Sequence, residues 1–268
     1  MNTALLFALN DNFILSMKVF LLSLIETNPW FDGDILLLSD GNLSNESIES
    51  VKLLYKHIKV LQPKKNDYTG CKPTTEQWGY NLFYRFDVFE MRDLGYDRII
   101  ILDSDMVVLK DISELFNYDY DFGSCKKHLG IPEIGPDDPK IRDKERFNCG
   151  LMSISKNILR PYYKDKLIRI ASRKSWSSDQ PVFNICFEDT VKYLPQEFNV
   201  VSSIATEKML QSANIIQYHG FTKPWHSDDP RKCFEPFVFE ELSKVATDTN
   251  KEAENLKRIF DSYAKQCA

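Results

Sequence analysis

Two aspartates, Asp103 and Asp105, directly follow the apolar run 99–102 and form the most specific chemical pattern in the chain. The run Ile-Ile-Ile-Leu predicts a buried strand, and in extended backbone the side chains at positions i and i+2 point the same way. Both carboxylates can then reach one hard divalent cation. The alternative is a strand-end turn with solvated aspartates, because aspartate is common in turns.

A second pattern is the loop 220–226, which reads Gly-Phe-Thr-Lys-Pro-Trp-His. Gly220 allows close backbone approach, Pro224 fixes the turn, and Lys223 offers a compact cation suited to phosphate. No acidic residue adjoins Lys223 in the sequence, as expected of a lysine whose charge is available to bind a phosphate. The alternative is a Pro-Trp turn packed on the core with an exposed lysine.

Two further segments place polar side chains beside predicted elements. Phe147-Asn148-Cys149-Gly150 precedes a predicted strand, and the segment 176–181 contains Asp179 and Gln180. The second segment also fits a simple helix start capped by Ser178 or Asp179.

These residues need a scaffold, and the first half of the chain alternates apolar runs with segments of helical periodicity. We predict strands over 4–9, 34–38, 58–61 and 99–102, with intervening helices that begin near residue 12 and cover 44–57 and 78–91. This order predicts an α/β fold with a mostly parallel sheet covered by helices on both faces. Ligands bind at the carboxyl ends of such strands, so the residues after Leu9, Leu38 and Leu102 are expected to line one crevice.

The second half is less regular. We predict strands over 120–125, 151–155 and 215–218, helices over 156–173 and 179–187, and long loops over 62–77 and 128–146. Long loops in a compact domain are usually lids or binding loops. A catalytic domain over 1–234 is expected to be followed by a helical tail over 235–268, with Leu256, Ile259, Phe260 and Tyr263 at helical spacing.

Composition excludes several classes of protein. The 268 residues are 43% hydrophobic and 27% charged, which is typical of a folded globular chain. A net charge of −5 argues against nucleic-acid binding, which needs an excess of clustered basic residues. The longest apolar stretches fall far short of the ~20 residues that span a bilayer.

The cysteines indicate a reducing compartment. There are 6 of them, with no Cys-x-x-Cys pair and no zinc-like spacing with the 4 histidines. The opening segment lacks the basic residues and cleavage site of a signal peptide. We therefore expect a cytoplasmic protein with reduced thiols, and leave open a peripheral contact with the inner face of the membrane.

Taken in order, the patterns resemble glycosyltransferase family 8, which includes glycogenin and bacterial lipopolysaccharide glucosyl- and galactosyltransferases. The resemblance covers about residues 4 to 226 and lies in seven segments. They are Phe7-Ala8-Leu9-Asn10-Asp11-Asn12-Phe13, Tyr84-Arg85-Phe86, Asp103-Ser104-Asp105, Phe147-Asn148-Cys149-Gly150, Asp179-Gln180, Leu194-Pro195-Gln196-Glu197-Phe198-Asn199 and 220–225.

The resemblance implies the GT-A fold, a UDP-sugar donor, Mn²⁺ or Mg²⁺ on Asp103 and Asp105, and retention of anomeric configuration. It also implies an acceptor that is a glycan or a lipid-linked saccharide, with glucose or galactose transferred in cell-surface polysaccharide or lipopolysaccharide synthesis. The implied donor contacts are Ala8, Asn10 and Asn12 on uridine, Phe13 on uracil, Ser104 on ribose, Arg85, Asn148 and Asp179 on sugar hydroxyls, and Gly220 with Lys223 at the diphosphate.

One position departs from the family pattern. The family's third metal ligand, a histidine, has its place six residues before the lysine of the Lys-Pro-Trp loop, and this chain has Gln217 there. His219 lies two residues later, on the same face of an extended strand. We favour His219 as the ligand, because imidazole binds Mn²⁺ better than a neutral amide, and keep Gln217 as the alternative.

The expected catalytic residues are Asp179, Gln180 and Lys223. Gln180 is the candidate for attack on the face opposite the acceptor, but an amide is a poor nucleophile. Front-face attack, assisted by a donor phosphate oxygen, is therefore favoured over double displacement. Two rival interpretations are a non-catalytic nucleotide-sugar-binding protein, because of Gln217, and a haloacid-dehalogenase-type phosphatase, because of the Asp-x-Asp after an apolar strand.

Overall fold

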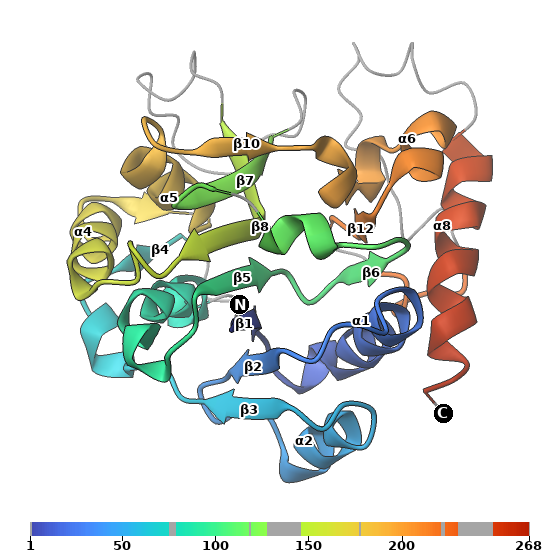
Figure 1. The fold of residues 1–268 in the computed structure, drawn as a ribbon, viewed down its shortest axis with the longest axis horizontal. Helices are drawn as coiled ribbons and strands as arrows, with labels where there is room; N and C mark the ends of the chain where they lie inside the picture. The colour runs from blue at the N-terminus through green and yellow to red at the C-terminus, as the bar shows by residue number, and fades with distance from the viewer. Residues whose placement is uncertain are drawn as a thin grey trace.

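The computed structural model describes residues 2–74, 79–117, 119–127, 146–176, 178–220, 223–229 and 249–267. A sheet of 7 strands, in the order β10-β7-β8-β5-β1-β2-β3, runs through its centre (Figure 1). The strands of this sheet are β1 (Thr3–Ala8), β2 (Asp34–Leu38), β3 (Ile58–Leu61), β5 (Arg98–Leu102), β7 (Phe122–Lys126), β8 (Phe147–Ser155) and β10 (Lys192–Leu194).

The predicted mostly parallel sheet is confirmed. β1 pairs in parallel with β2 and β5, β2 with β3, and β7 with β10. β8 runs antiparallel to both of its neighbours, β5 and β7. Because β1 pairs in parallel with β2 and β5, the carboxyl ends of these three strands lie at one edge of the sheet, as expected, and Leu9 N donates to the carbonyl of Leu38 at 3.2 Å.

Helices cover both faces of the sheet. They are η1 (Asp11–Phe13), α1 (Ile14–Thr27), α2 (Asn45–Lys52), η2 (Lys65–Tyr68), η3 (Gly79–Leu94), η4 (Ser113–Phe116), α4 (Pro161–Ala171), α5 (Gln180–Phe187), η5 (Gln196–Phe198), η6 (Ser202–Ile204), α6 (Glu207–Ser212) and α8 (Thr249–Ala264). Smaller sheets join β11 (Val200–Val201), β12 (Ile215–Gln217) and β6 (Met106–Val108), and pair β4 (Lys72–Pro73) with β9 (Ser175–Trp176).

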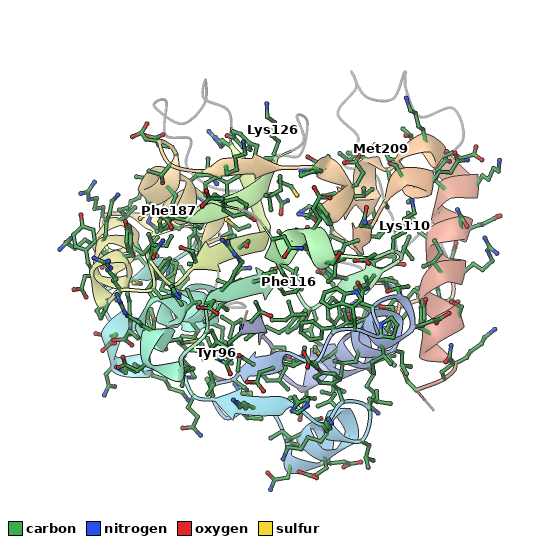
Figure 2. All side chains as sticks on the ribbon, in the orientation of Figure 1. Tyr96, Lys110, Phe116, Lys126, Phe187 and Met209 are labelled. Carbon is green, nitrogen blue, oxygen red and sulfur yellow. The ribbon has the colours of Figure 1, made fainter. Side chains whose placement is uncertain are left out.

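The alternation of side chains along β1 creates two separate cores. Leu5 and Phe7 are fully buried against α1 and α2, whereas Ala4 and Leu6 are fully buried with aromatic residues of η3 and α5. On that second face Phe187 of α5, labelled in Figure 2, stacks on Phe122 of β7, with ring centroids 4.2 Å apart. The strands are therefore held from both sides, and their carboxyl ends are rigidly placed.

The predicted closing helix is present as α8, which lies beside α1 (Figure 1). Leu256 and Phe260 are 1% exposed and pack with Val19 of α1 and with Ile216 of β12. Tyr218, directly after β12, donates its hydroxyl to the carbonyl of Leu256 at 3.0 Å. Among the described residues, no helix combines the length and the apolar composition needed to cross a bilayer.

Several predicted boundaries are wrong. The helix predicted from residue 156 begins at Pro161. Proline is favoured at the first helical position, because the N–H that it lacks would have no partner within the helix there. α2 ends at Lys52 and not at residue 57. The predicted loop 62–77 contains η2 and β4, so part of it is regular structure. Of the predicted loop 128–146, residues 128–145 lie outside the described part of the chain.

Candidate active site

Asp103 and Asp105 leave the carboxyl end of β5, as predicted, and neighbouring strands hold their backbone. Asp103 N donates to the carbonyl of Gly150 on β8 at 2.8 Å. The carbonyl of Asp105 accepts the N–H of Tyr218, directly after β12, at 2.8 Å. Asp103 is partly exposed and Asp105 is buried, so the first carboxylate is the more accessible to a ligand.

Arg85, on η3, lies between two of the predicted site carboxylates. Its Nε donates to Asp179 Oδ2 at 2.8 Å and its Nη2 to Asp179 Oδ1 at 2.7 Å, the forked geometry of a strong ion pair. Its Nη1 donates to Asp103 Oδ1 at 2.8 Å and to the carbonyl of Cys149 at 3.0 Å. Arg85 therefore joins the start of α5 to the end of β5.

The charges in this cluster influence one another strongly. Burial raises the pKa of Asp103. The negative charges of Asp105 and Asp179 raise the pKa of Asp103 further, while the positive charges of Arg85 and Lys223 lower it. Burial also raises the pKa of Asp179, against the pull of Arg85. Burial disfavours the charged form of Arg85, but Asp179 and Asp103 outweigh it and raise the pKa of the guanidinium. Bringing another positive charge to these carboxylates would stabilise their ionised forms.

Lys223 contradicts one expectation from the sequence. Its ammonium does have an acidic neighbour, because Nζ lies 2.5 Å from Asp105 Oδ2 and also donates to the carbonyl of Tyr218 at 2.9 Å. The two residues are 118 positions apart, which is why no local pattern revealed the pair. Gly220 opens the loop with a φ of 121°, a backbone angle that only glycine adopts readily, while residues 221 and 222 lie outside the described part.

Gln217 and His219 both lie near the acidic pair. Gln217 Nε2 donates to Asp103 Oδ2 at 2.5 Å, and the side chain is 3% exposed. Burial lowers the pKa of His219, while the charge of Asp105 raises it and that of Lys223 lowers it. His219 therefore favours the neutral form that ligates metals.

The donor atoms at this place fit a hard divalent cation. Within the described residues, Asp105 Oδ1 and Gln217 Oε1 are buried oxygens without a hydrogen-bond partner, which is costly unless a cation or ligand group meets them. Gly150 leaves room for the Gln217 amide, since a Cβ there would lie 2.4 Å from Oε1. Carboxylate and amide oxygens are ligands that Mg²⁺ and Mn²⁺ accept.

Gly150→Ala tests this cradle directly. The added methyl must displace the Gln217 amide, which is the far end of a side chain, so we expect the fold to survive. Mn²⁺ affinity, measured by titration of the EPR signal of free Mn²⁺, is expected to fall about tenfold or more. Gly70→Ala is the matched control, because its Cβ would approach the Ser172 side chain, with the hydroxyl oxygen at 3.2 Å, and not the Gln217 amide. Unchanged Mn²⁺ affinity in Gly150→Ala, with a loss in His219→Ala, would make His219 the third ligand.

Asn148 lies inside β8, and not before a strand as predicted. Its Oδ1 accepts the N–H of Gly150 at 2.6 Å and the Nδ2 of Asn199 at 3.0 Å. Asn199 is fully buried. It belongs to the motif 194–199, and the sequence suggests no individual role for this residue. Its contact shows that it orients Asn148. Gln180, the first residue of α5, accepts the N–H of Cys149 through Oε1 at 3.0 Å, so α5 is fixed to β8 beside Asp179.

The turn after β1 lies close to the Lys-Pro-Trp loop. Asn10 Oδ1 accepts the N–H of Asn12 at 3.0 Å and caps η1, which follows Ala8 by three residues. The ring of Phe13 meets the ring of Trp225 edge to face, with centroids 5.9 Å apart. Ser104 is buried, and its carbonyl accepts the hydroxyl of Ser16. The residues predicted to bind uridine, ribose and diphosphate are thus carried by neighbouring segments.

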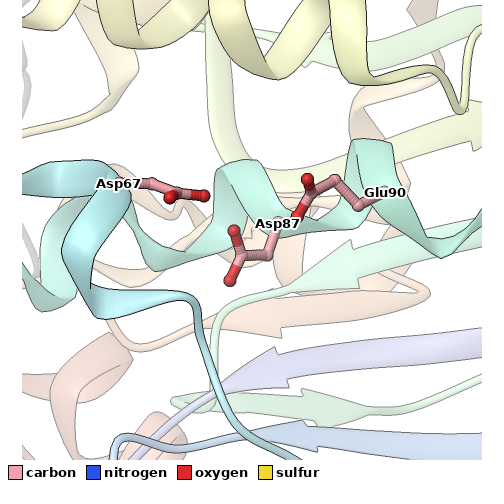
Figure 3. Close-up of side chains that lie close together, drawn as sticks. All are labelled: Asp67, Asp87 and Glu90. Atoms are coloured by element: carbon pink, nitrogen blue, oxygen red, sulfur yellow. The ribbon is translucent and has the colours of Figure 1, made fainter.

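A second group of carboxylates, Asp67, Asp87 and Glu90, lies elsewhere on η2 and η3 (Figure 3). Their oxygens are close enough to hold a cation. The ammonium of Lys164, a residue that is 2% exposed, already supplies the positive charge. Its Nζ lies 2.5 Å from Asp67, 2.7 Å from Asp87 and 2.8 Å from Glu90. This group is an ion-pair network that joins α4 to η2 and η3, and it is not the metal site expected from the sequence.

Comparison with known sequences decides the family. Residues 4–229 match the sequence profile of Glycosyl transferase family 8. The chain belongs to glycosyltransferase family 8. Membership in family 8 agrees with the resemblance based on the seven segments and removes the phosphatase interpretation.

The chain is similar in sequence to named members of this family. It is 24% identical over 257 residues to lipopolysaccharide 1,2-glucosyltransferase of Escherichia coli K12, covering 82% of this chain and 72% of that protein. It is 25% identical over 203 residues to glycogenin of Neurospora crassa, covering 71% of this chain and 26% of that protein.

The fold is also shared with a solved galactosyltransferase, LgtC, in complex with donor and acceptor sugar analogs. The TM-score is 0.66 at 19% identity, over 91% of this chain and 95% of that one. The bifunctional glycosyltransferase WbbM gives a TM-score of 0.68 at 18% identity, over 91% of this chain and 51% of that one. The expected GT-A fold is therefore confirmed.

Proposed function

We propose that the chain is a retaining, metal-dependent hexosyltransferase that uses a UDP-sugar. The acceptor is a hydroxyl of a glycan or lipid-linked saccharide, and glucose or galactose is the favoured sugar. One observation carries the proposal: in a family 8 chain, Asp103 and Asp105 leave the carboxyl end of β5 with Arg85 and Lys223 on their oxygens. The name of the Escherichia coli relative, a lipopolysaccharide 1,2-glucosyltransferase, supports lipopolysaccharide or another cell-surface polysaccharide as the setting.

The leaving group needs positive charge, because a nucleoside diphosphate departs with negative charge on its phosphates. Asp103, Asp105 and Gln217 or His219 would hold the divalent ion, which supplies Lewis-acid charge at the phosphates when bound. Lys223 adds a point charge from the Gly220 loop, and this charge is most effective as the diphosphate separates.

Arg85 and Asp179 have a different task. Four hydrogen bonds fix the guanidinium of Arg85 and leave one of its five N–H donors, on Nη2, that can donate to a sugar hydroxyl. Asp179 holds Arg85 in this orientation and is itself 3% exposed. Asn148, which Asn199 contacts, lies on β8 two residues before Gly150, whose carbonyl accepts the N–H of Asp103. These groups fit a role in positioning the donor sugar.

Front-face attack remains the proposed route to retention. Gln180 carries an amide, and its Oε1 already accepts the N–H of Cys149, so it is poorly suited to form a covalent bond with the sugar. The acceptor hydroxyl would then transfer its proton to a donor phosphate oxygen. The five described cysteines form no disulfide with one another, which supports the proposed cytoplasmic location.

The deciding experiment is release of UDP from a panel of UDP-sugars with Mn²⁺ and no acceptor. We expect release of UDP from UDP-glucose or UDP-galactose, loss of that release in EDTA, and no release of GDP from GDP-mannose. Binding of UDP without release from any donor, with or without candidate glycans, would instead favour a nucleotide-sugar-binding protein. Failure to bind UDP at all would overturn the proposal.

A further inference from the structure

Lys223 occupies the position where a positive charge is most needed when no ligand is bound. Its ammonium lies 2.5 Å from Asp105 Oδ2, and the two side chains are 11% and 9% exposed. The carbonyl of Tyr218 takes a second of its three donors at 2.9 Å. A buried carboxylate without such a partner would be strongly destabilising, so this contact stabilises the ligand-free site.

Both aspartates of the pair are already neutralised by basic side chains of the chain itself. Arg85 Nη1 donates to one oxygen of Asp103, Gln217 Nε2 donates to the other, and Lys223 holds Asp105. A divalent cation that approaches Asp105 therefore meets the ammonium of Lys223, and the two like charges repel each other at close range. Asp105 Oδ1 has no hydrogen-bond partner in the described part of the chain, but a cation on it would lie close to the ammonium on Oδ2, so cation binding favours a Lys223 that has left Asp105.

The two basic residues differ in how readily they can leave. Arg85 is held by four hydrogen bonds to Asp179, Asp103 and Cys149. Lys223 has two, and its charge is carried on a flexible four-carbon stem. Leaving Asp105 would cost a buried lysine its counter-ion, unless a phosphate offers a new one. A diphosphate can provide that partner, and the cation can then take over Asp105.

We infer that Lys223 is the counter-ion of Asp105 in the ligand-free site and exchanges places with the divalent cation when a nucleoside diphosphate binds. Metal and nucleotide then bind with positive coupling, because each removes the obstacle that the other meets. This inference rests on the proposed use of a UDP-sugar. It goes further by assigning Lys223 a second role, which keeps the site closed to metal until the nucleotide arrives.

The test measures Mn²⁺ binding to the whole chain through the EPR signal of free Mn²⁺, without and with saturating UDP. In the wild-type chain we expect UDP to tighten Mn²⁺ binding by more than about 10-fold, within the usual range of coupling between sites. Lys223→Met removes the competing charge. It is expected to bind Mn²⁺ alone at least about 5-fold more tightly than wild type, and UDP should then add less than about 3-fold.

A matched control separates this effect from the general loss of a buried lysine. Lys257 pairs with Asp261 at 2.6 Å and is 10% exposed, so Lys257→Met makes the same chemical change on α8. It should leave Mn²⁺ binding and its coupling to UDP unchanged. Circular dichroism confirms folding, and Lys223→Gln provides a second uncharged variant. In both uncharged variants, we expect Mn²⁺ alone to raise the melting temperature more than it does in wild type.

Two results would overturn the inference. One is that Lys223→Met and Lys223→Gln bind Mn²⁺ alone no more tightly than wild type does. The other is that UDP binds to the wild-type chain without changing its Mn²⁺ affinity. If UDP does not bind at all, the proposed function fails, while the comparison of Mn²⁺ alone still decides whether Lys223 competes with metal.

Discussion

Asp103→Asn and Asp105→Asn are each expected to reduce sugar transfer by more than about 100-fold, the usual effect of losing one stabiliser of developing charge. Each change replaces a charged oxygen by an amide nitrogen at the end of β5 and keeps the shape of the side chain. The rate is measured as UDP release with Mn²⁺, and EDTA should abolish release by the wild-type chain. Full activity in EDTA would contradict metal dependence.

The two variants should differ in stability, and this difference is an internal check. Asp105→Asn leaves the buried ammonium of Lys223 without its counter-ion. In Asp103→Asn, Arg85 still pairs with Asp179, so we expect Asp105→Asn to destabilise the chain more. Urea unfolding measures this difference. Asp97→Asn is the control, because Asp97 pairs with Lys156 at the surface and should affect neither activity nor stability greatly.

Arg85→Met is expected to have the largest combined effect of any single change. It leaves Asp179, whose side chain is 4% exposed, as an uncompensated buried carboxylate, which typically costs about 3 to 5 kcal/mol in the free energy of unfolding. Transfer should also fall by more than about 100-fold, because the guanidinium that orients Asp103 is lost.

A double variant separates the two roles of Arg85. Arg85→Met combined with Asp179→Leu removes both members of the forked pair, and replacing a buried ion pair with apolar side chains is often neutral for stability. We expect the double variant to recover most of the lost stability but none of the activity. Recovery of activity would show that Arg85 serves only the fold, and Arg85→Lys should rescue little because lysine lacks the fork.

Local patterns were sufficient for the central strands. The apolar run before Asp103 predicted β5 to within one residue, and 34–38 and 58–61 are β2 and β3 as predicted. Residues 35–38 of β2 and 99–102 of β5 are apolar and buried on both faces, so they are easily recognised. β3 lies at the edge of the sheet, and its Lys59 and Val60 are exposed. Helix boundaries were less predictable. The start of α4 is set by Pro161, which lacks a backbone N–H, and the spacing of apolar residues does not reveal such a limit.

The sequence by itself determined the family and named the candidate site residues, since each motif is a short run whose members are neighbours in the chain. Only the tertiary structure decided how their charges are paired. Arg85 meets Asp179 across 94 positions, and Lys223 meets Asp105 across 118. Ion pairs depend on where β5, β8, β12 and α5 converge, and that convergence results from packing two cores on one sheet. For this reason Lys223, which the sequence presents as an isolated cation, lies on the carboxylate that is expected to hold the metal.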